Sequence, residues 1–325
     1  MLRPLIPIFA LTLSACAGIN TRLPSIAAPD LAAETQAQET KALRRIERQT
    51  QRLLNVGWPI LSANAELCPR RAPAIGVKTH SDESYSKRLR DGAARVLGAD
   101  DVSRVFAVAE GSPAQMSGLQ RGDVLLNADA EPTKPHGEDW EAQLETGRIN
   151  VRRGETVLSL EVQPAEICNY ALRLSSSGAV NAYADGRNIT VTTAMVDFVN
   201  SDQELALIIG HELGHNAMGH IRKIVGNFII SLGGTRYTRP FESEADYVGL
   251  YYMVRAGFAP DGVEDFWRRL SVVAPRGINR AKTHPRFPDR YLRIAAARRE
   301  ILAKQAAGAP LVPNFLNAGE TTSED

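Results

Sequence analysis

The sequence has no surplus of charge of either sign and no apolar run long enough to cross a bilayer as a helix. Its 38 lysines and arginines face 37 aspartates and glutamates, a formal net charge of +1, which predicts no nucleic-acid partner. Hydrophobic residues make up 44% and charged residues 23% of the chain, which excludes a disordered or polytopic membrane protein. A globular protein of 325 residues has room for two domains.

The N-terminus is typical of an export signal. A basic residue precedes the apolar run from Leu5 to Leu13, which is too short for a permanent transmembrane helix. The stretch Leu13-Ser14-Ala15-Cys16 resembles the lipobox of bacterial lipoproteins, which implies cleavage before Cys16 and lipidation of that residue. The alternative is a plain signal peptide with an incidental cysteine.

We therefore expect a signal peptide over residues 1–15 and a lipidated tether over 16–33 that attaches the protein to a membrane. The mature chain would be a lipoprotein of the bacterial cell envelope that faces the periplasm. Ala17 stands where some bacteria place an aspartate to retain lipoproteins in the inner membrane, so the sequence favours the outer membrane.

Cysteine is scarce, with three in the chain. An odd number in an exported protein calls for an explanation, and lipidation of Cys16 leaves Cys68 and Cys168 as a pair. A disulfide between them would join both ends of the intervening segment to the main body in an oxidising compartment. Two buried free thiols are the alternative, because sequence does not show the Cα separation that a disulfide needs.

Residues 34–71 are expected to be an N-terminal helical segment of the main body. Apolar residues recur there at nearly helical spacing in a charged background, and we predict that the helix ends at Gly57 and Pro59. Residues 72–165 change to short strands with turn signals. Their motifs Gly111-Ser112-Pro113-Ala114, Gly118-Leu119 and Gly122-Asp123-Val124 resemble a PDZ domain of the bacterial protease type. A small β-rich spacer is the alternative.

The main body resumes over residues 166–307 and is followed by a tail over 308–325 that we expect to be flexible. Asp185-Gly186 predicts a hairpin turn between two short strands. Ser201 and Glu204 form a capping pattern before a helix that reaches about residue 222. Further helices are expected over about 242–256, after Asp261, and over 289–307.

The first of these helices contains a metal-binding pattern. His211 and His215 are four residues apart, so they project from one face and can meet one zinc ion. Glu212 lies between them, where it can accept a proton from water at an open zinc position. His220 points away from that face on an ideal helix. We expect it at the surface or beside the site rather than as a ligand.

The next helix carries the acids that complete the pattern. His211-Glu212-x-x-His215 followed by Glu242-x-x-Ala245-Asp246 resembles the zinc peptidase family of HtpX, the CAAX prenyl proteases, BepA and the Oma proteases. By this resemblance Glu242 rather than its competitor Glu244 is the third ligand, and Asp246 orients a ligating histidine.

A third block, Thr283 to Arg290, resembles the family's Thr-His-Pro-x-x-x-x-Arg element. It implies that His284 lies near the metal, as an oxyanion stabiliser or as a regulatory ligand.

The resemblance implies an α+β protein: a mainly helical zincin-type peptidase domain with a small sheet, plus the β-rich PDZ-like domain. It implies one zinc ion per chain, with Glu212 as general base, and hydrolysis of peptide bonds. We expect the edge strand at Asn181, Ala182 and Tyr183 to bind extended polypeptides by main-chain hydrogen bonds. Such binding suits an endopeptidase acting on unfolded or misassembled envelope proteins.

Two alternatives remain open on the sequence alone. One is a chaperone-like or binding factor for envelope assembly with a latent zinc site. The weaker one is a purely structural zinc site. The oligomeric state is not predicted.

Overall fold

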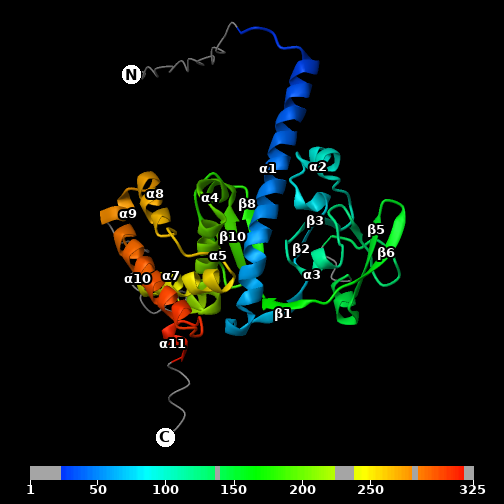
Figure 1. The fold of residues 1–325 in the computed structure, drawn as a ribbon. Coiled ribbons are helices and arrows are strands. Elements are labelled where there is room, and N and C mark those ends of the chain that lie inside the picture. The colour runs from blue at the N-terminus through cyan, green and yellow to red at the C-terminus, as the bar shows by residue number, and fades with distance from the viewer. Residues whose placement is uncertain (1–22, 136–139, 224–237, 280–284, 318–325) are drawn as a thin grey trace, which may run out of the picture. The chain divides into compact units, whose positions relative to one another are not determined.

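The computed structural model describes residues 23–135, 140–223, 238–279 and 285–317 (Figure 1). The predicted signal peptide with Cys16 lies outside the described residues. So do His284 and the short apolar stretch IVGNFIISLGG at 224–234, between the two zinc-binding motifs. Helices and several small sheets make up the described ranges, which confirms the α+β class. Within these ranges no helix is both long and apolar enough to cross a bilayer.

Helix α1 (Ala28–Ala63) begins inside the segment that was expected to be an irregular tether. The described residues of this part, 23–38, belong to a unit of their own, and their side chains are exposed. The sequence here is rich in alanine, glutamate and glutamine, which are strong helix formers. Gln38 also donates a hydrogen bond to Glu34 one turn earlier, at 2.8 Å. Local propensity therefore explains the early start.

Helix α1 also continues past Gly57 and Pro59, so its predicted end there was wrong. Pro59 removes one main-chain hydrogen bond from the helix. Its neighbours Trp58 and Ile60 are buried, 6% and 0% exposed, and this packing outweighs the local cost. A Cβ on Gly57 would lie 2.3 Å from Leu172 Cδ1. Glycine thus lets the Leu172 side chain of strand β8 (Ala171–Ser175) pack directly against the α1 backbone, and a larger residue would require that side chain to move.

Residues 72–165, which we call the insertion, contain a five-stranded antiparallel sheet. Its strands lie side by side in the order in which they occur along the chain. The strands are β2 (Val77–His80), β3 (Arg104–Val108), β4 (Val124–Leu125), β5 (Arg148–Arg153) and β6 (Thr156–Glu161). The short helices among them are η2 (Asp82–Ser84), α2 (Arg90–Leu97), α3 (Pro113–Met116) and η3 (Glu141–Thr146). Its own buried cluster includes Val105, Leu125, Ile149 and Val151.

A two-stranded ribbon closes the insertion at its base. Strand β1 (Arg71–Ala74) pairs antiparallel with β7 (Ala165–Cys168), and Arg71 lies opposite Cys168. After α1 and the short helix η1 (Ala65–Leu67), Cys68 forms a disulfide with Cys168, with a Cα separation of 5.5 Å. The predicted boundaries 72 and 165 therefore fall within this ribbon.

The rest of the chain packs helices around a three-stranded sheet with the order β8-β10-β9. Strand β8 (Ala171–Ser175) is parallel to β10 (Asn188–Thr192), and β9 (Ala182–Ala184) is antiparallel to β10. The predicted hairpin turn joins β9 to β10, and Gly186 there has a φ of +90°. The helices are α4 (Thr193–Phe198), α5 (Asp202–Ala217), α7 (Thr238–Arg255), α8 (Asp265–Val273), α9 (Arg276–Asn279), α10 (Phe287–Ala306) and α11 (Asn314–Asn317).

The first part of the C-terminal tail is held by hydrogen bonds, unlike the flexible segment that was expected. Lys304 Nζ donates to the Val312 carbonyl at 2.5 Å, and Arg255 donates to the Leu311 carbonyl at 3.3 Å. The amide of Asn314 donates to the Tyr247 hydroxyl at 3.2 Å. The contacts of Arg255 with Leu311 and of Asn314 with Tyr247 join residues that are far apart in the sequence. Such contacts leave no local pattern, which explains why the sequence does not predict them.

Candidate metal centre

Two helices meet at the predicted metal site because small residues face each other where they cross. A Cβ on Gly210 of α5 would lie 2.5 Å from the Gly249 carbonyl oxygen of α7, and one on Gly249 would lie 2.6 Å from the His211 nitrogen. One turn along, a Cβ on Gly214 would lie 3.3 Å from the Cα of Ala245. Side chains at these positions would separate the helices. The glycines that precede the two histidines therefore bring the histidines within reach of the acids on α7.

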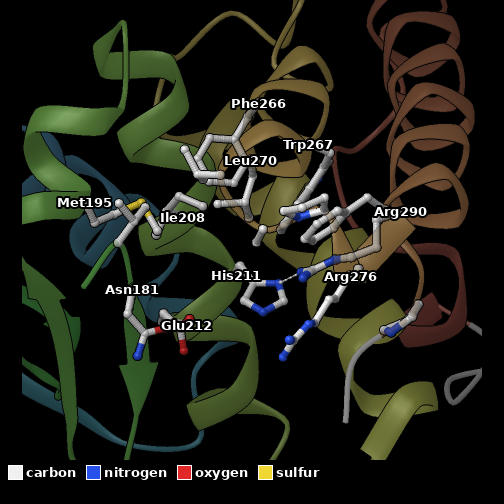
Figure 2. A pocket seen from close by; sticks show the side chains of 18 residues that line it. Asn181, Met195, Ile208, His211, Glu212, Phe266, Trp267, Leu270, Arg276 and Arg290 are labelled. Atoms are coloured by element: carbon white, nitrogen blue, oxygen red, sulfur yellow. Dashed lines mark hydrogen bonds between the residues drawn. The ribbon is translucent and has the colours of Figure 1, made fainter. Parts of the chain in front are cut away.

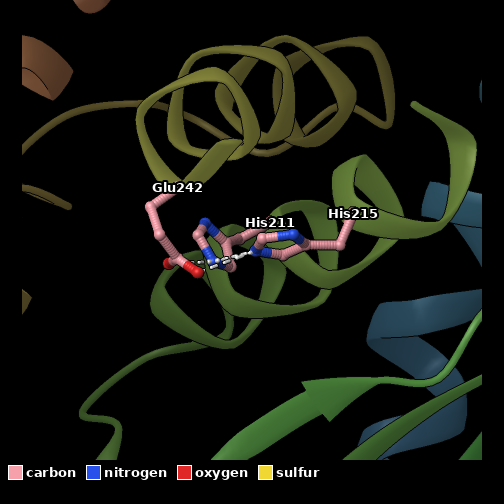
Figure 3. Close-up of side chains that lie close together, drawn as sticks. All are labelled: His211, His215 and Glu242. Atoms are coloured by element: carbon pink, nitrogen blue, oxygen red, sulfur yellow. Dashed lines mark hydrogen bonds and ion pairs between the residues drawn. The ribbon is translucent and has the colours of Figure 1, made fainter. Parts of the chain in front are cut away.

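His211, His215 and Glu242 converge on one point, as Figure 3 shows. The Nε2 atoms of the two histidines are 3.1 Å apart, and the Glu242 carboxylate oxygens lie 3.6 Å from Nε2 of His211 and 3.5 Å from Nε2 of His215. Tetrahedral zinc with nitrogen and oxygen ligands separates its donor atoms by roughly 3.3–3.5 Å. The three side chains are buried, at 6–7% exposure. Their donor types and spacing therefore fit a zinc ion.

Asp246, the acid expected to orient a ligating histidine, lies against His211. Its Oδ1 lies 2.9 Å from Nδ1 of His211, on the side of the ring opposite the metal position. A proton on Nδ1 then leaves the Nε2 lone pair free for a metal. Burial lowers the pKa of His211, but its hydrogen bonds to Asp246 and Glu242 outweigh burial and raise that pKa to about 10. The site is thus strongly attractive to a positive charge.

Arg290 also binds Asp246, a role that the sequence analysis did not predict for this arginine. Its guanidinium donates to both Asp246 carboxylate oxygens, at 2.7 and 2.6 Å, and lies 3.6 Å from the ring centroid of Trp267. Burial raises the pKa of Asp246, but Arg290 and His211 outweigh burial and hold it below its usual range. Arg290 ends the Thr-His-Pro-x-x-x-x-Arg block, so the signal was present. Its partner only becomes evident in the fold.

His220 is not at the surface, so that part of the expectation was wrong. It is 0% exposed, and its Nδ1 lies 3.1 Å from Nδ1 of His215. Its Nε2 lies 3.0 Å from Oε2 of Glu244, the acid that competed for the third ligand position. Burial, and next the neighbouring His215, lower the pKa of His220 to about 4, so this histidine is neutral. The triad identified by geometry contains Glu242 and not Glu244.

Glu212 lies beside the triad on the wall of a pocket of about 590 Å³ (Figure 2). Figure 2 draws Glu212 and Asn181, the residue at the start of the predicted edge strand, among the side chains that line this pocket. Asn181 and Ala182 line the pocket, and Tyr183 is 46% exposed. Much of the remaining wall is apolar, with Met195, Ile208, Phe266, Trp267, Leu270 and Phe287 among the lining residues. The proton-accepting Glu212 and one residue of the triad, His211, thus line the same largely apolar cavity.

Asn216 ties the edge strand to the histidine helix. Its amide nitrogen donates to the Asn188 carbonyl at 3.0 Å, and its Oδ1 accepts from the Gly186 amide at 2.7 Å. The β9–β10 hairpin is therefore fixed to the residue after His215. The sequence offered no sign of this link, because an asparagine after a ligand has no characteristic pattern. Among the strands that the structure describes, β9 is an edge strand: it pairs with β10 on one side and with no strand on the other.

Residues 152–230 match the model of a protein family described as peptidase family M48. The chain is 27% identical over 142 residues to the mitochondrial metalloendopeptidase OMA1 of Arabidopsis thaliana, which covers 36% of this chain and 29% of that protein. It is 24% identical over 163 residues to the β-barrel assembly-enhancing protease of Yersinia pestis, covering 38% and 33%. This chain therefore spans about a third of the length of these curated relatives.

A PDZ domain of HtrA3 bound to a phage-derived ligand superimposes with a TM-score of 0.23 and 25% identity, covering 30% of this chain and 88% of that domain. This likeness is too loose to define the fold of the insertion, so the PDZ-like character stays a prediction.

The family match, which includes His211-Glu212-x-x-His215, and the two relatives confirm the resemblance to this zinc peptidase family that the motifs carried. Both relatives are proteases by name, one a metalloendopeptidase and the other a β-barrel assembly-enhancing protease.

Proposed function

We propose that this protein is a zinc-dependent endopeptidase that cleaves extended segments of unfolded or misassembled cell-envelope proteins. The observation that carries the proposal is the position of Glu212. It lines the same pocket as His211 and as Asn181 and Ala182 of the predicted edge strand. A purely structural metal site needs neither an adjacent acid nor a substrate-sized cavity.

His211, His215 and Glu242 would hold the zinc ion. A zinc ion so bound supplies Lewis acidity, which brings the pKa of water toward neutrality and polarises a carbonyl group. Glu212 takes the proton of the attacking water and delivers it to the leaving amide nitrogen. Asp246 and Arg290 keep the His211 ring in the orientation that presents Nε2. These roles are consistent with three buried side chains that converge on one point from two rigid helices.

Strand β9 supports extended polypeptides as substrates. A strand at the edge of a sheet offers main-chain groups to an added strand, and this mode of binding depends little on side-chain identity. The adjacent pocket supplies the selective element. Its apolar wall, with Ile208 on α5 and Phe266 and Leu270 on α8, favours a large apolar side chain. Folded proteins bury such side chains, whereas unfolded ones expose them.

A location in the cell envelope is supported by the N-terminus and by the cysteines. The lipobox at Cys16 would attach the chain to a membrane, with the outer membrane favoured. The disulfide between Cys68 and Cys168 suits an oxidising compartment such as the periplasm. The Yersinia relative is named for enhancing β-barrel assembly, which favours misassembled outer-membrane proteins as substrates.

Cleavage assays with the purified zinc-loaded chain test this proposal. We expect an unfolded outer-membrane protein to be cleaved and its folded form to be spared. In model peptides, replacing the apolar residue at the cleavage site by a small one should lower kcat/KM roughly 10- to 200-fold. Leu270→Glu in the pocket should reduce this preference, whereas Leu292→Glu, at a position 65% exposed on α10, should leave it unchanged.

Equal cleavage of folded and unfolded substrate would contradict the proposed substrate class. An envelope defect rescued equally by wild type and by Glu212→Gln would instead favour the chaperone-like alternative.

A further inference from the structure

His220 makes contacts that a histidine serving only as packing does not need. It is fully buried, and its two ring nitrogens face two different polar partners, His215 and Glu244. Phe241 stacks against its ring, with centroids 4.8 Å apart and an interplanar angle of 25°. The ring is thus confined to one orientation, and each nitrogen is 3.0 or 3.1 Å from its partner. These contacts lead outward from the metal centre, from His215 through His220 to Glu244.

The backbone explains why His220 returns to the site. Helix α5 ends at Ala217, and Gly219 has a φ of +66°, a left-handed conformation that favours glycine. The chain therefore leaves the helical path before His220. The ideal helix that would have pointed His220 away from His215 does not extend that far.

The positions of the protons in this chain of residues follow from the metal site. To bind a metal through Nε2, His215 must present that nitrogen's lone pair to the triad, so its proton lies on Nδ1. Two nitrogens 3.1 Å apart form a hydrogen bond only when one of them donates. His215 Nδ1 therefore donates to His220 Nδ1. Because His220 Nδ1 accepts this hydrogen bond, the ring proton of His220 lies on Nε2, which is 3.0 Å from Oε2 of Glu244 and donates to that carboxylate.

We propose that His220 and Glu244 are positioning residues that hold His215 in its metal-binding tautomer and orientation. This inference rests on the proposed zinc site. His220 acts on His215 as Asp246 acts on His211, with Glu244 fixing the His220 proton in turn. Helix α7 thereby serves the centre three times, through Glu242 as ligand and through the two acids that orient the histidines. Partners of ligating histidines typically contribute to metal affinity as well as to activity.

Metal affinity measured without substrate tests this proposal. Wild type and the variants His220→Leu, His220→Asn and Glu244→Ala are stripped of metal and titrated with zinc against a chromophoric chelator at pH 7.5. We expect His220→Leu to weaken zinc binding roughly 10- to 100-fold, because it removes the acceptor for His215 Nδ1. His220→Asn should restore much of the affinity, since its side-chain oxygen can accept that hydrogen bond. Glu244→Ala should give a smaller loss than His220→Leu.

Two further measurements separate positioning from packing. The cobalt-substituted variants should show a changed visible absorption spectrum in His220→Leu and a nearly native one in His220→Asn. His80→Gln, which changes a buried histidine in the insertion (6% exposed), should leave zinc affinity unchanged. If His220→Leu does not fold, Glu244→Ala still reports on the same chain of hydrogen bonds.

Zinc affinities of His220→Leu and Glu244→Ala within twofold of wild type would overturn the positioning role and leave the proposed peptidase activity standing. A wild-type protein that binds no zinc would overturn both proposals. Normal zinc binding without cleavage of any substrate would overturn the peptidase proposal alone.

Discussion

Removing Arg290 should destabilise the protein far more than removing an exposed arginine. Its guanidinium makes hydrogen bonds of 2.6 and 2.7 Å to the Asp246 carboxylate, and the two residues are 5% and 1% exposed. Arg290→Met keeps most of the side-chain volume against Trp267 but removes the guanidinium that binds both oxygens of the buried carboxylate, which retains only its contact with His211 among the contacts described above. Breaking a buried pair by removing one partner costs about 3–5 kcal/mol. For a protein of this size the melting temperature should fall by roughly 4–7 °C.

The control is Arg148→Met, which removes an ion pair with Glu161 whose side chains are 63% and 83% exposed. Such a pair contributes less than about 1 kcal/mol. Thermal unfolding of the chelator-treated proteins, followed by circular dichroism, compares the variants without the contribution of bound metal. Asp246→Asn combined with Arg290→Met should be less destabilised than Arg290→Met alone, because the unpaired charge is gone. A loss for Arg290→Met no larger than that for Arg148→Met would refute this reasoning.

Two other predictions concern the insertion. Replacing Cys68 and Cys168 by serine should lower the free energy of unfolding by about 2–5 kcal/mol, because the disulfide closes a long loop with a sequence separation of 100; urea titrations under non-reducing conditions measure this, and a loss below about 1 kcal/mol would contradict it. Burial, and then the nearby Arg121 and Arg104, lower the pKa of His80 to about 4 from 6.5. The unfolded chain therefore binds a proton below pH 6.5 that folded His80 refuses until about pH 4, so stability should fall by up to about 3 kcal/mol across that interval. His80→Gln should lose this part of the pH dependence in urea titrations at pH 7 and pH 5, and an unchanged pH dependence would contradict the assignment.

The sequence allowed the metal triad to be predicted because its signals are short-range. His211 and His215 share a helix face by spacing alone, and the family pattern selects Glu242 on the following helix. The close contact of the two helices also has a visible cause, since Gly210 and Gly249 face each other.

The parts that sequence missed depend on contacts between distant residues. Helix α1 passes Pro59 because its neighbours pack into the core, and local propensity does not report that packing. His220 returns to the site because Gly219 ends the helical path, whereas the pattern was projected onto an unbroken helix. Arg290 appears in the sequence analysis only as the last residue of a motif. Its ion pair with Asp246 joins residues 44 positions apart, so no local pattern indicates it.

The Glu212→Gln variant tests the central claim most directly. Glutamine has nearly the same shape as glutamate but accepts no proton at neutral pH, and Glu212 is not among the three triad residues. We predict that the variant binds one zinc ion per chain, as wild type does, while cleavage of an unfolded substrate falls by roughly 10²- to 10⁴-fold. Cleavage at the wild-type rate by the zinc-loaded variant would contradict the account.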